Sequence, residues 1–302
     1  MPLWIPVTVA AAVFQCWRTA MQAKLRGLLS VNGSGFTRFL YGLPASLAFL
    51  ALFTLAGRGV LPTPSWPMVL YAACGGFMQI IATNLLIMAF GFRNFAVGTA
   101  YAKTEAAQAA LIALVVLHQS LPGLAWAGIL VSVGGVLLLS LGERGLRLRQ
   151  LLRATAQPAA LSGLAAAFCF AVTAVLIQLA THRITGGNVV TRALYVLAAT
   201  TALQTLMQGG YLLLRDRAEL RRTLLAWRRA AWVGVASAAG SACWFTAFSL
   251  TNVGLVRALG QIEVLFTLLA GHFYLRERIK LSEANGLLLV ALGVVLILIA
   301  SA

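Results

Sequence analysis

Charged residues are scarce in this chain: Asp, Glu, Lys and Arg together make up 10% of its 302 residues, whereas 61% are hydrophobic. Soluble globular domains carry about 25% charged residues, so this composition excludes a water-soluble enzyme. The four cysteines are isolated within apolar segments and form no CxxC pair, which excludes a disulfide scaffold and favours packing roles over metal or redox chemistry. The mean hydropathy of +0.90 predicts a polytopic membrane protein.

Acidic residues and histidines are rarer still, with seven Asp and Glu and three His. The histidines are scattered, and the sequence contains no GxSxG, HExxH or GxxxxGKS/T motif. We therefore expect no enzyme, no metal or cofactor, and no ATP-driven transport by this chain alone. The net charge of +16 would favour a nucleic-acid partner for a soluble protein. Here the basic residues lie mainly between apolar runs, so no nucleic-acid partner is expected.

Ten apolar segments have about the 20 residues that a helix needs to cross a bilayer. They cover residues 3–23, 35–56, 66–90, 95–117, 122–141, 158–181, 189–213, 230–250, 254–275 and 281–300. Sixteen of the 23 Lys and Arg residues fall in odd-numbered connections, and two fall in even-numbered connections or at the termini. Because short loops rich in Lys and Arg stay in the cytoplasm, we expect both termini in the periplasm. High Ala, Leu and Arg usage with three lysines indicates a GC-rich bacterial genome and hence an inner membrane.

The sequence repeats itself once. Thr37-Arg38-Phe39-Leu40-Tyr41 recurs as Thr191-Arg192-Ala193-Leu194-Tyr195 at an offset of 154, and Glu105 matches Glu263 at an offset of 158. Each copy holds an odd number of spans, so the second copy enters the membrane from the opposite side. We predict an all-α integral membrane fold of ten transmembrane helices in two inverted five-helix repeats. The predicted units are residues 1–145, a basic cytoplasmic linker at 146–157, and residues 158–302.

Each half carries an Arg near the start of its second span, Arg38 and Arg192. The second half closes on Leu275-Arg276-Glu277-Arg278 followed by Gly286 and Gly293. These patterns, repeated over ten spans, make the chain resemble the drug/metabolite transporter superfamily, in the branch with two tandem EamA domains. The resemblance implies a ten-helix fold and the export or exchange of small metabolites, amino acids or drugs.

The sequence also departs from the family pattern. His118-Gln119-Ser120 stands where a Gly-Glu pair is usual, and Glu105 or Glu263 stands near a position that is proline in many members. Many ten-helix relatives are drawn with cytoplasmic termini, whereas the charge count here predicts periplasmic ones.

Glu105 and Glu263 lie near the middle of their predicted spans. A carboxylate at that depth is costly unless it is protonated, paired or hydrated. Two such groups across a pseudo-two-fold axis suit a cationic ligand group or a proton. The alternative is a structural ion pair with Lys103, Arg18 or Arg257.

We expect Glu105 to be the substrate or proton site, with a change of protonation during transport. Tyr101 and Gln108, which share its helical face, can hydrogen-bond to a polar ligand. Glu263 has apolar neighbours and is expected to be held by Arg18 or Lys103. Lys103 lies about 200° around the helix from Glu105, so it is either a partner for a carboxylate on another helix or a substrate contact.

Other polar and aromatic residues complete the predicted lining. Gln15, Arg18, Thr19 and Gln22 form a polar stripe on the first span, and Arg18 suits a substrate carboxylate or a deep glutamate equally well. Gln79 and Asn84 suit interhelical hydrogen bonding, and Trp17 and Trp244 suit packing or stacking on a substrate. Arg38 and Arg192 are expected to snorkel to the interface. The full candidate set is Gln15, Trp17, Arg18, Gln79, Asn84, Tyr101, Lys103, Glu105, Gln108, Trp244 and Glu263.

The function predicted from these features is secondary transport by alternating access. The expected substrate is a small amine-bearing metabolite, an amino acid or a cationic drug-like compound, exported in exchange for protons. The alternatives are uptake or exchange of another metabolite class and, in a different class, a membrane-embedded enzyme or a scaffold subunit. The expected partners are the small-molecule substrate, protons and the lipid bilayer, with the chain as a monomer or homodimer.

Overall fold

The computed structural model describes residues 2–25, 27–57, 59–89, 101–142, 158–266 and 281–301. This part of the chain is helical, apart from an isolated bridge between Thr63 and Thr185, so the all-α prediction is confirmed there. The helices are α1 (Trp4–Leu25), α2 (Val31–Leu40), α3 (Gly42–Leu55), α4 (Trp66–Ala89), α6 (Glu105–Leu117), α7 (Gly123–Gly142), α9 (Pro158–His182), α10 (Val189–Arg215), α11 (Arg217–Leu225), α12 (Trp227–Leu250), α13 (Val253–Leu259) and α15 (Leu281–Ala300). The linker expected at residues 146–157 and the motif at 275–278 lie outside the described residues.

Among the described residues, five helical stretches are long and apolar enough to cross a membrane. They are Val31–Leu55, which joins α2 and α3, together with α4, α9, α10 and α12. Large apolar side chains are exposed on several of them, including Leu55 at 84% and Leu214 at 79%. Such a surface is unfavourable in water and suits contact with lipid.

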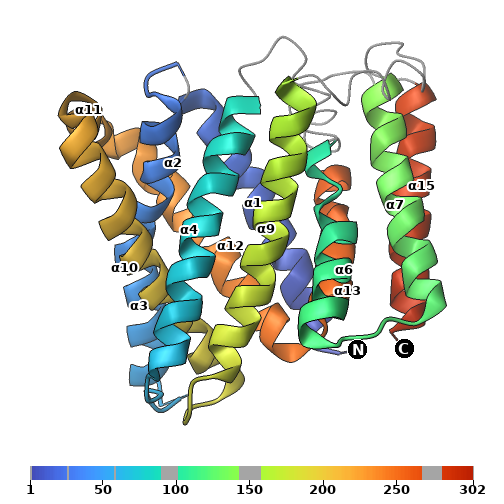
Figure 1. The fold of residues 1–302 in the computed structure, drawn as a ribbon, viewed down its shortest axis with the longest axis horizontal. Coiled ribbons are helices and arrows are strands. Elements are labelled where there is room, and N and C mark those ends of the chain that lie inside the picture. Colours follow the sequence, from blue (N-terminus) through green and yellow to red (C-terminus); the bar gives the residue numbers. More distant parts are fainter. Residues whose placement is uncertain are drawn as a thin grey trace.

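Both chain ends lie at one end of the helix bundle (Figure 1). The connection between α3 and α4 and the connection between α9 and α10 lie at the same end, and α11 lies at the opposite end. Thr63 and Thr185 pair across these two connections, and the Ser65 hydroxyl donates to the carbonyl of Arg183. The two connections therefore form one joined surface.

The most extensive helix–helix contacts are made between helices that lie far apart in the sequence. α1 packs along α12, α4 packs along α9, α7 packs along α15, and α6 contacts both α9 and α13. At the α7–α15 contact, a Cβ added to Gly128 would lie 2.7 Å from the carbonyl oxygen of Gly293, and one added to Gly135 would lie 2.8 Å from that of Gly286. Only glycine permits backbones to approach this closely.

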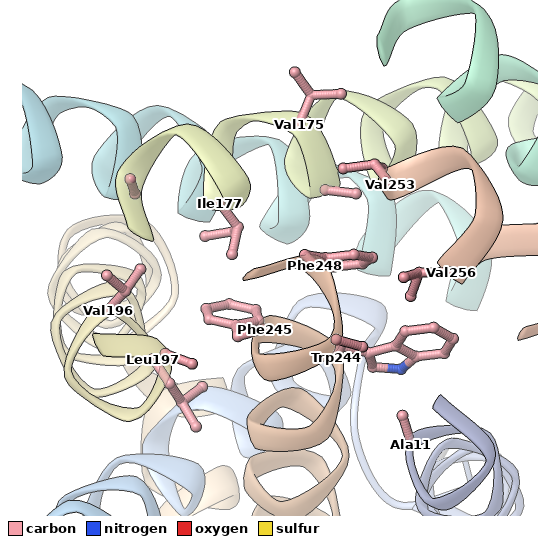
Figure 2. Close-up of a cluster of buried hydrophobic side chains, with 14 of the residues drawn as sticks. Ala11, Val175, Ile177, Val196, Leu197, Trp244, Phe245, Phe248, Val253 and Val256 are labelled. Atoms are coloured by element: carbon pink, nitrogen blue, oxygen red, sulfur yellow. The ribbon is translucent and has the colours of Figure 1, made fainter. Parts of the chain in front are cut away.

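The largest buried apolar cluster among the described residues surrounds α12. Figure 2 shows Trp244, Phe245 and Phe248 side by side on this helix, with Phe245 toward Leu197 of α10 and Trp244 toward Val256 of α13. The rings of Trp244 and Phe248 are stacked, with centroids 5.8 Å apart. The cluster forms a rigid wall next to the buried charges described below.

Breaks interrupt three of the spans that the hydrophobic pattern predicted to be continuous. Tyr41 separates α2 from α3, and a turn at Lys103 and Thr104 immediately precedes α6. A 3₁₀ turn, η1 (Gly260–Ile262), separates α13 from Glu263. Hydropathy records the length of an apolar run and is insensitive to such a local change of backbone, so the sequence pattern carries no signal for these positions.

The short helix α11 is tied to the start of α2 by one buried carboxylate. Glu219 is 2% exposed and accepts a hydrogen bond from the backbone N–H of Ser30. Its other oxygen lies 3.6 Å from Arg222, whose side chain is 70% exposed. Asp216 caps α11 by accepting from the backbone N–H of Glu219 at 3.0 Å.

Candidate functional site

Both deep glutamates are engaged in ion pairs between the first and second halves of the sequence. Glu105 Oε1 lies 2.8 Å from Nη1 of Arg257, and Glu263 Oε2 lies 2.8 Å from Nζ of Lys103. The amide of Gln261 also donates to the carbonyl of Lys103 at 2.8 Å. The turn before α6 and the turn after α13 are therefore held together by one ion pair and a hydrogen bond, and a second ion pair joins α6 to α13.

The local breaks explain this arrangement. Because the turn at Lys103 and Thr104 interrupts the helix, Glu105 is the first residue of α6 rather than a residue at mid-helix. A carboxylate in the first turn of a helix is favoured by the helix dipole. The turn lies between Tyr101, which is buried, and Glu105, so helical spacing alone no longer places the two side chains on one face. Gln108 is half-buried and donates locally to Oγ1 of Thr104 at 3.0 Å.

Glu263 has more hydrogen-bond partners than Glu105 among the described residues. Gln15 Nε2 donates to the same Glu263 oxygen that binds Lys103, at 2.8 Å. Gln15 in turn accepts a 3.0 Å hydrogen bond from the indole N–H of Trp244. The side chain of Glu263 is 9% exposed and that of Glu105 is 16% exposed. Glu263 is thus the more firmly held carboxylate.

Arg257 is held between a carboxylate and an aromatic wall. Its guanidinium carbon lies 4.8 Å from the ring centroid of Trp244 and 5.0 Å from that of Phe248. Cation–π contacts of this kind stabilise a desolvated cation. Trp244 therefore contacts the Arg257 cation directly. It is also linked by hydrogen bonds through Gln15 to Glu263, the partner of Lys103.

Arg18 is buried without a carboxylate partner in the described part of the chain. It is 6% exposed, and the one hydrogen bond from its side chain joins Nη2 to the hydroxyl of Thr19 at 3.3 Å. It lies within electrostatic range of Glu105 and Glu263. Direct pairing with these glutamates is made by Lys103 and Arg257 instead, so the expectation that Arg18 neutralises one of them does not describe this state.

A second polar cluster lies between α2, α4, α10 and α12. Arg38 donates to Oγ1 of Thr83 at 3.0 Å, and Gln204 donates to Oε1 of Gln79 at 2.7 Å. Arg38 and Gln204 are 5% and 1% exposed. A small cavity opens here, lined by Arg38, Phe39, Gly42, Gln79, Leu197, Thr201, Gln204, Ser237, Ala238 and Ser241.

The predicted snorkelling of Arg38 was therefore wrong. α2 begins at Val31, four residues before the predicted start of the span, which places Arg38 about two turns inside the helix. Arg192, its counterpart in the repeat, lies in the first turn of α10 and donates to the loop carbonyl of Gly186 at 2.9 Å. Gln204 is not among the residues predicted from the sequence, although its i, i+4 spacing to Gln208 in an apolar span was a signal.

Two further candidates lie apart from the charged cluster. Asn84 donates to Oδ1 of Asn32 at 3.0 Å, and Gln208 donates to the carbonyl of Asn32 at the same distance. Asn84 thus links helices by hydrogen bonds. Trp17 is 52% exposed; it lies about 200° around α1 from Gln15, so it faces away from the ion pairs and is removed from the predicted lining.

Metal binding has no support in the described residues, where no three His, Cys, Asp or Glu side chains gather into a possible site. The buried groups can instead exchange ion-pair partners, receive a proton, or contact a charged ligand.

Comparison with known proteins gives the class of the molecule. Residues 157–299 match the EamA-like transporter family. No curated protein matches the chain. A solved crystal structure is similar over 97% of this chain and 94% of its own, with a TM-score of 0.72 and 15% sequence identity, which shows a shared fold. The second half of this multi-pass membrane protein is therefore similar to an EamA-like transporter domain.

Proposed function

We propose that the protein is a secondary transporter that exports a small amine-bearing metabolite, an amino acid or a cationic drug-like compound across the inner membrane, with protons as the coupling ion. The observation that carries this proposal is the pair of buried ion pairs, Glu105 with Arg257 and Lys103 with Glu263. Each joins one half of the sequence to the other. A structure that alternates between two faces needs contacts between its halves that can be broken and remade.

The inverted-repeat arrangement is part of the proposal. α1 packs on α12 and α4 packs on α9, so the first helix of each half contacts the third helix of the other. α6 packs on α13 and α7 packs on α15, so the fourth and fifth helices contact their own counterparts. A two-fold relation between two five-helix units requires this reciprocal pattern, which supports rocking of one unit against the other.

Glu105 is the proposed site of proton or substrate exchange. It is the less enclosed carboxylate, and its cation partner Arg257 retains two aromatic neighbours when the pair opens. A proton or an ammonium group arriving at Glu105 competes with Arg257 for the carboxylate. When the pair between Glu105 and Arg257 opens, one of the two ionic contacts between the halves is broken. The contact between Lys103 and Glu263 stays in place.

The experiment is flux in proteoliposomes made with the purified protein. A panel of amines and amino acids is tested with and without an imposed pH gradient. The proposal predicts saturable flux of at least one compound that is accelerated by the gradient. If no compound of the panel is transported, or if the pH gradient does not change the flux, the proposal of proton-coupled transport is contradicted.

A further inference from the structure

The buried charges do not balance in the described helices. Four cations lie buried or half-buried inside the helix bundle, namely Arg18, Arg38, Lys103 and Arg257. A fifth half-buried cation, Arg192, lies in the first turn of α10 and donates to the loop carbonyl of Gly186. The carboxylates found inside the bundle are Glu105 and Glu263, and each is already paired. The other acidic side chains that the structure places are Glu219, which lies on α11, and Asp216, which caps it. A buried guanidinium without a counter-ion is costly, so such groups in membrane proteins usually serve a ligand or an ion.

Arg38 has unused hydrogen-bonding capacity. A guanidinium carries five N–H donors, and the printed sequence places no acidic residue on α2. In the described structure Arg38 donates to the neutral hydroxyl of Thr83 and lies over the ring of Phe39 at 5.6 Å. Neither partner neutralises the charge. Arg18 and Arg257 repel it, and Glu105 attracts it without contact.

The cavity beside Arg38 offers further donors and no carboxylate. Its polar lining consists of Arg38, Gln79, Thr201, Gln204, Ser237 and Ser241. Since Gln204 donates to Oε1 of Gln79, the remaining hydrogen-bonding group of Gln79 is its amide NH₂, a donor. The hydroxyls of Ser237 and Ser241 can donate as well, whereas the Thr201 hydroxyl already donates to the carbonyl of Leu197 and the Gln204 amide already donates to Gly76 and Gln79. The cavity has a volume of about 10 Å³, which is close to the space that one water molecule needs, and its one cation with several neutral donors favours a single negatively charged atom of a bound group.

We propose that this cavity is an anion-binding subsite in which Arg38 receives one negatively charged group. The group is either the carboxylate of a carried metabolite or a small inorganic anion such as chloride. The subsite is separate from the Glu105 and Glu263 pairs, and the binding of an anion to the purified protein requires neither transport nor proton coupling.

The test measures thermal unfolding of the purified full-length protein by tryptophan fluorescence. Chloride and acetate are titrated separately against the potassium salt of a bulky sulfonate buffer at constant ionic strength. The wild type is expected to show a saturable rise in the unfolding midpoint with acetate, with chloride, or with both. A response to acetate alone identifies a carboxylate group, and a response to chloride identifies an inorganic anion.

The variants locate the effect. Arg38→Gln is expected to abolish the anion-dependent rise, and Arg192→Gln, which alters the matching Arg of the repeat, is expected to preserve it. If Arg38→Gln fails to fold, the paired change Ser237→Ala with Ser241→Ala keeps the guanidinium and should weaken apparent anion affinity by about tenfold or more, because each lost hydrogen bond to a charged group weakens binding. Absence of any saturable rise in the wild type overturns the proposal, as does an unchanged rise in the Arg38→Gln or double-serine variant.

Discussion

Replacing the two deep glutamates one at a time should separate a structural ion pair from a functional one. Glu263→Gln removes the partner of Lys103 and the charge that Gln15 binds. Breaking a buried pair costs about 3–5 kcal/mol, and the lower end applies because the Lys103 side chain is 23% exposed. We expect a loss of about 3 kcal/mol in the free energy of unfolding.

Compared with Glu263→Gln, the Glu105→Gln change should lower the free energy of unfolding less and reduce transport more. Arg257 keeps its positions over Trp244 and Phe248 after the change, and each such contact is worth about 1–2 kcal/mol for a desolvated cation. A glutamine oxygen can still accept from the guanidinium. We expect a loss of about 1 kcal/mol in stability, with proton-dependent flux abolished because glutamine does not titrate.

The assay combines two measurements on the same preparations. SDS titration followed by tryptophan fluorescence gives the free energy of unfolding, and proteoliposome flux with a pH gradient gives transport. The double variant Lys103→Met with Glu263→Gln should recover part of the lost stability, because it leaves no unpaired charge. Wild-type pH dependence in Glu105→Gln, or wild-type stability in Glu263→Gln, would refute the reasoning.

Three further predictions concern packing and topology. Gly135→Leu should force α7 and α15 apart and cost more than about 2 kcal/mol, whereas Gly134→Leu, with open space at its Cβ, should cost little in the same SDS titration. Glu219→Ala should leave the Ser30 N–H unsatisfied and cost about 1–3 kcal/mol, while Arg222→Ala should lie within about 0.5 kcal/mol of the wild type because its side chain is exposed. A reporter fused to the C-terminus should be active only in the periplasm; cytoplasmic activity would reverse the charge-based orientation.

The extent of the helices could be predicted because lipid imposes a minimum apolar length and water-facing connections are polar. The predicted segment at 158–181 became α9 at Pro158–His182, and the one at 66–90 became α4 at Trp66–Ala89. The breaks before Glu105 and Glu263 could not be predicted in this way. They involve ordinary residues such as Lys103 and Thr104, and tertiary contacts decide their backbone conformation.

The ion-pair partners were only partly predictable. Helical spacing excluded a pair between Lys103 and Glu105, and the structure pairs Lys103 with Glu263. Helical spacing could not decide between Arg18 and Arg257 as the partner of Glu105, because that choice depends on how α1 and α13 pack in space. The burial of Arg38 was missed because an error of one helical turn at Val31 moves a side chain from the interface to the interior.

Counterflow tests the proposed transport mechanism most directly. Proteoliposomes are loaded with an unlabelled compound that the flux panel identifies, and the labelled compound is added outside without any ion gradient. A carrier that alternates between two faces predicts transient, saturable accumulation of label that depends on the internal load. Label that enters at the same rate with and without the internal load, or in linear proportion to its concentration, would contradict alternating access.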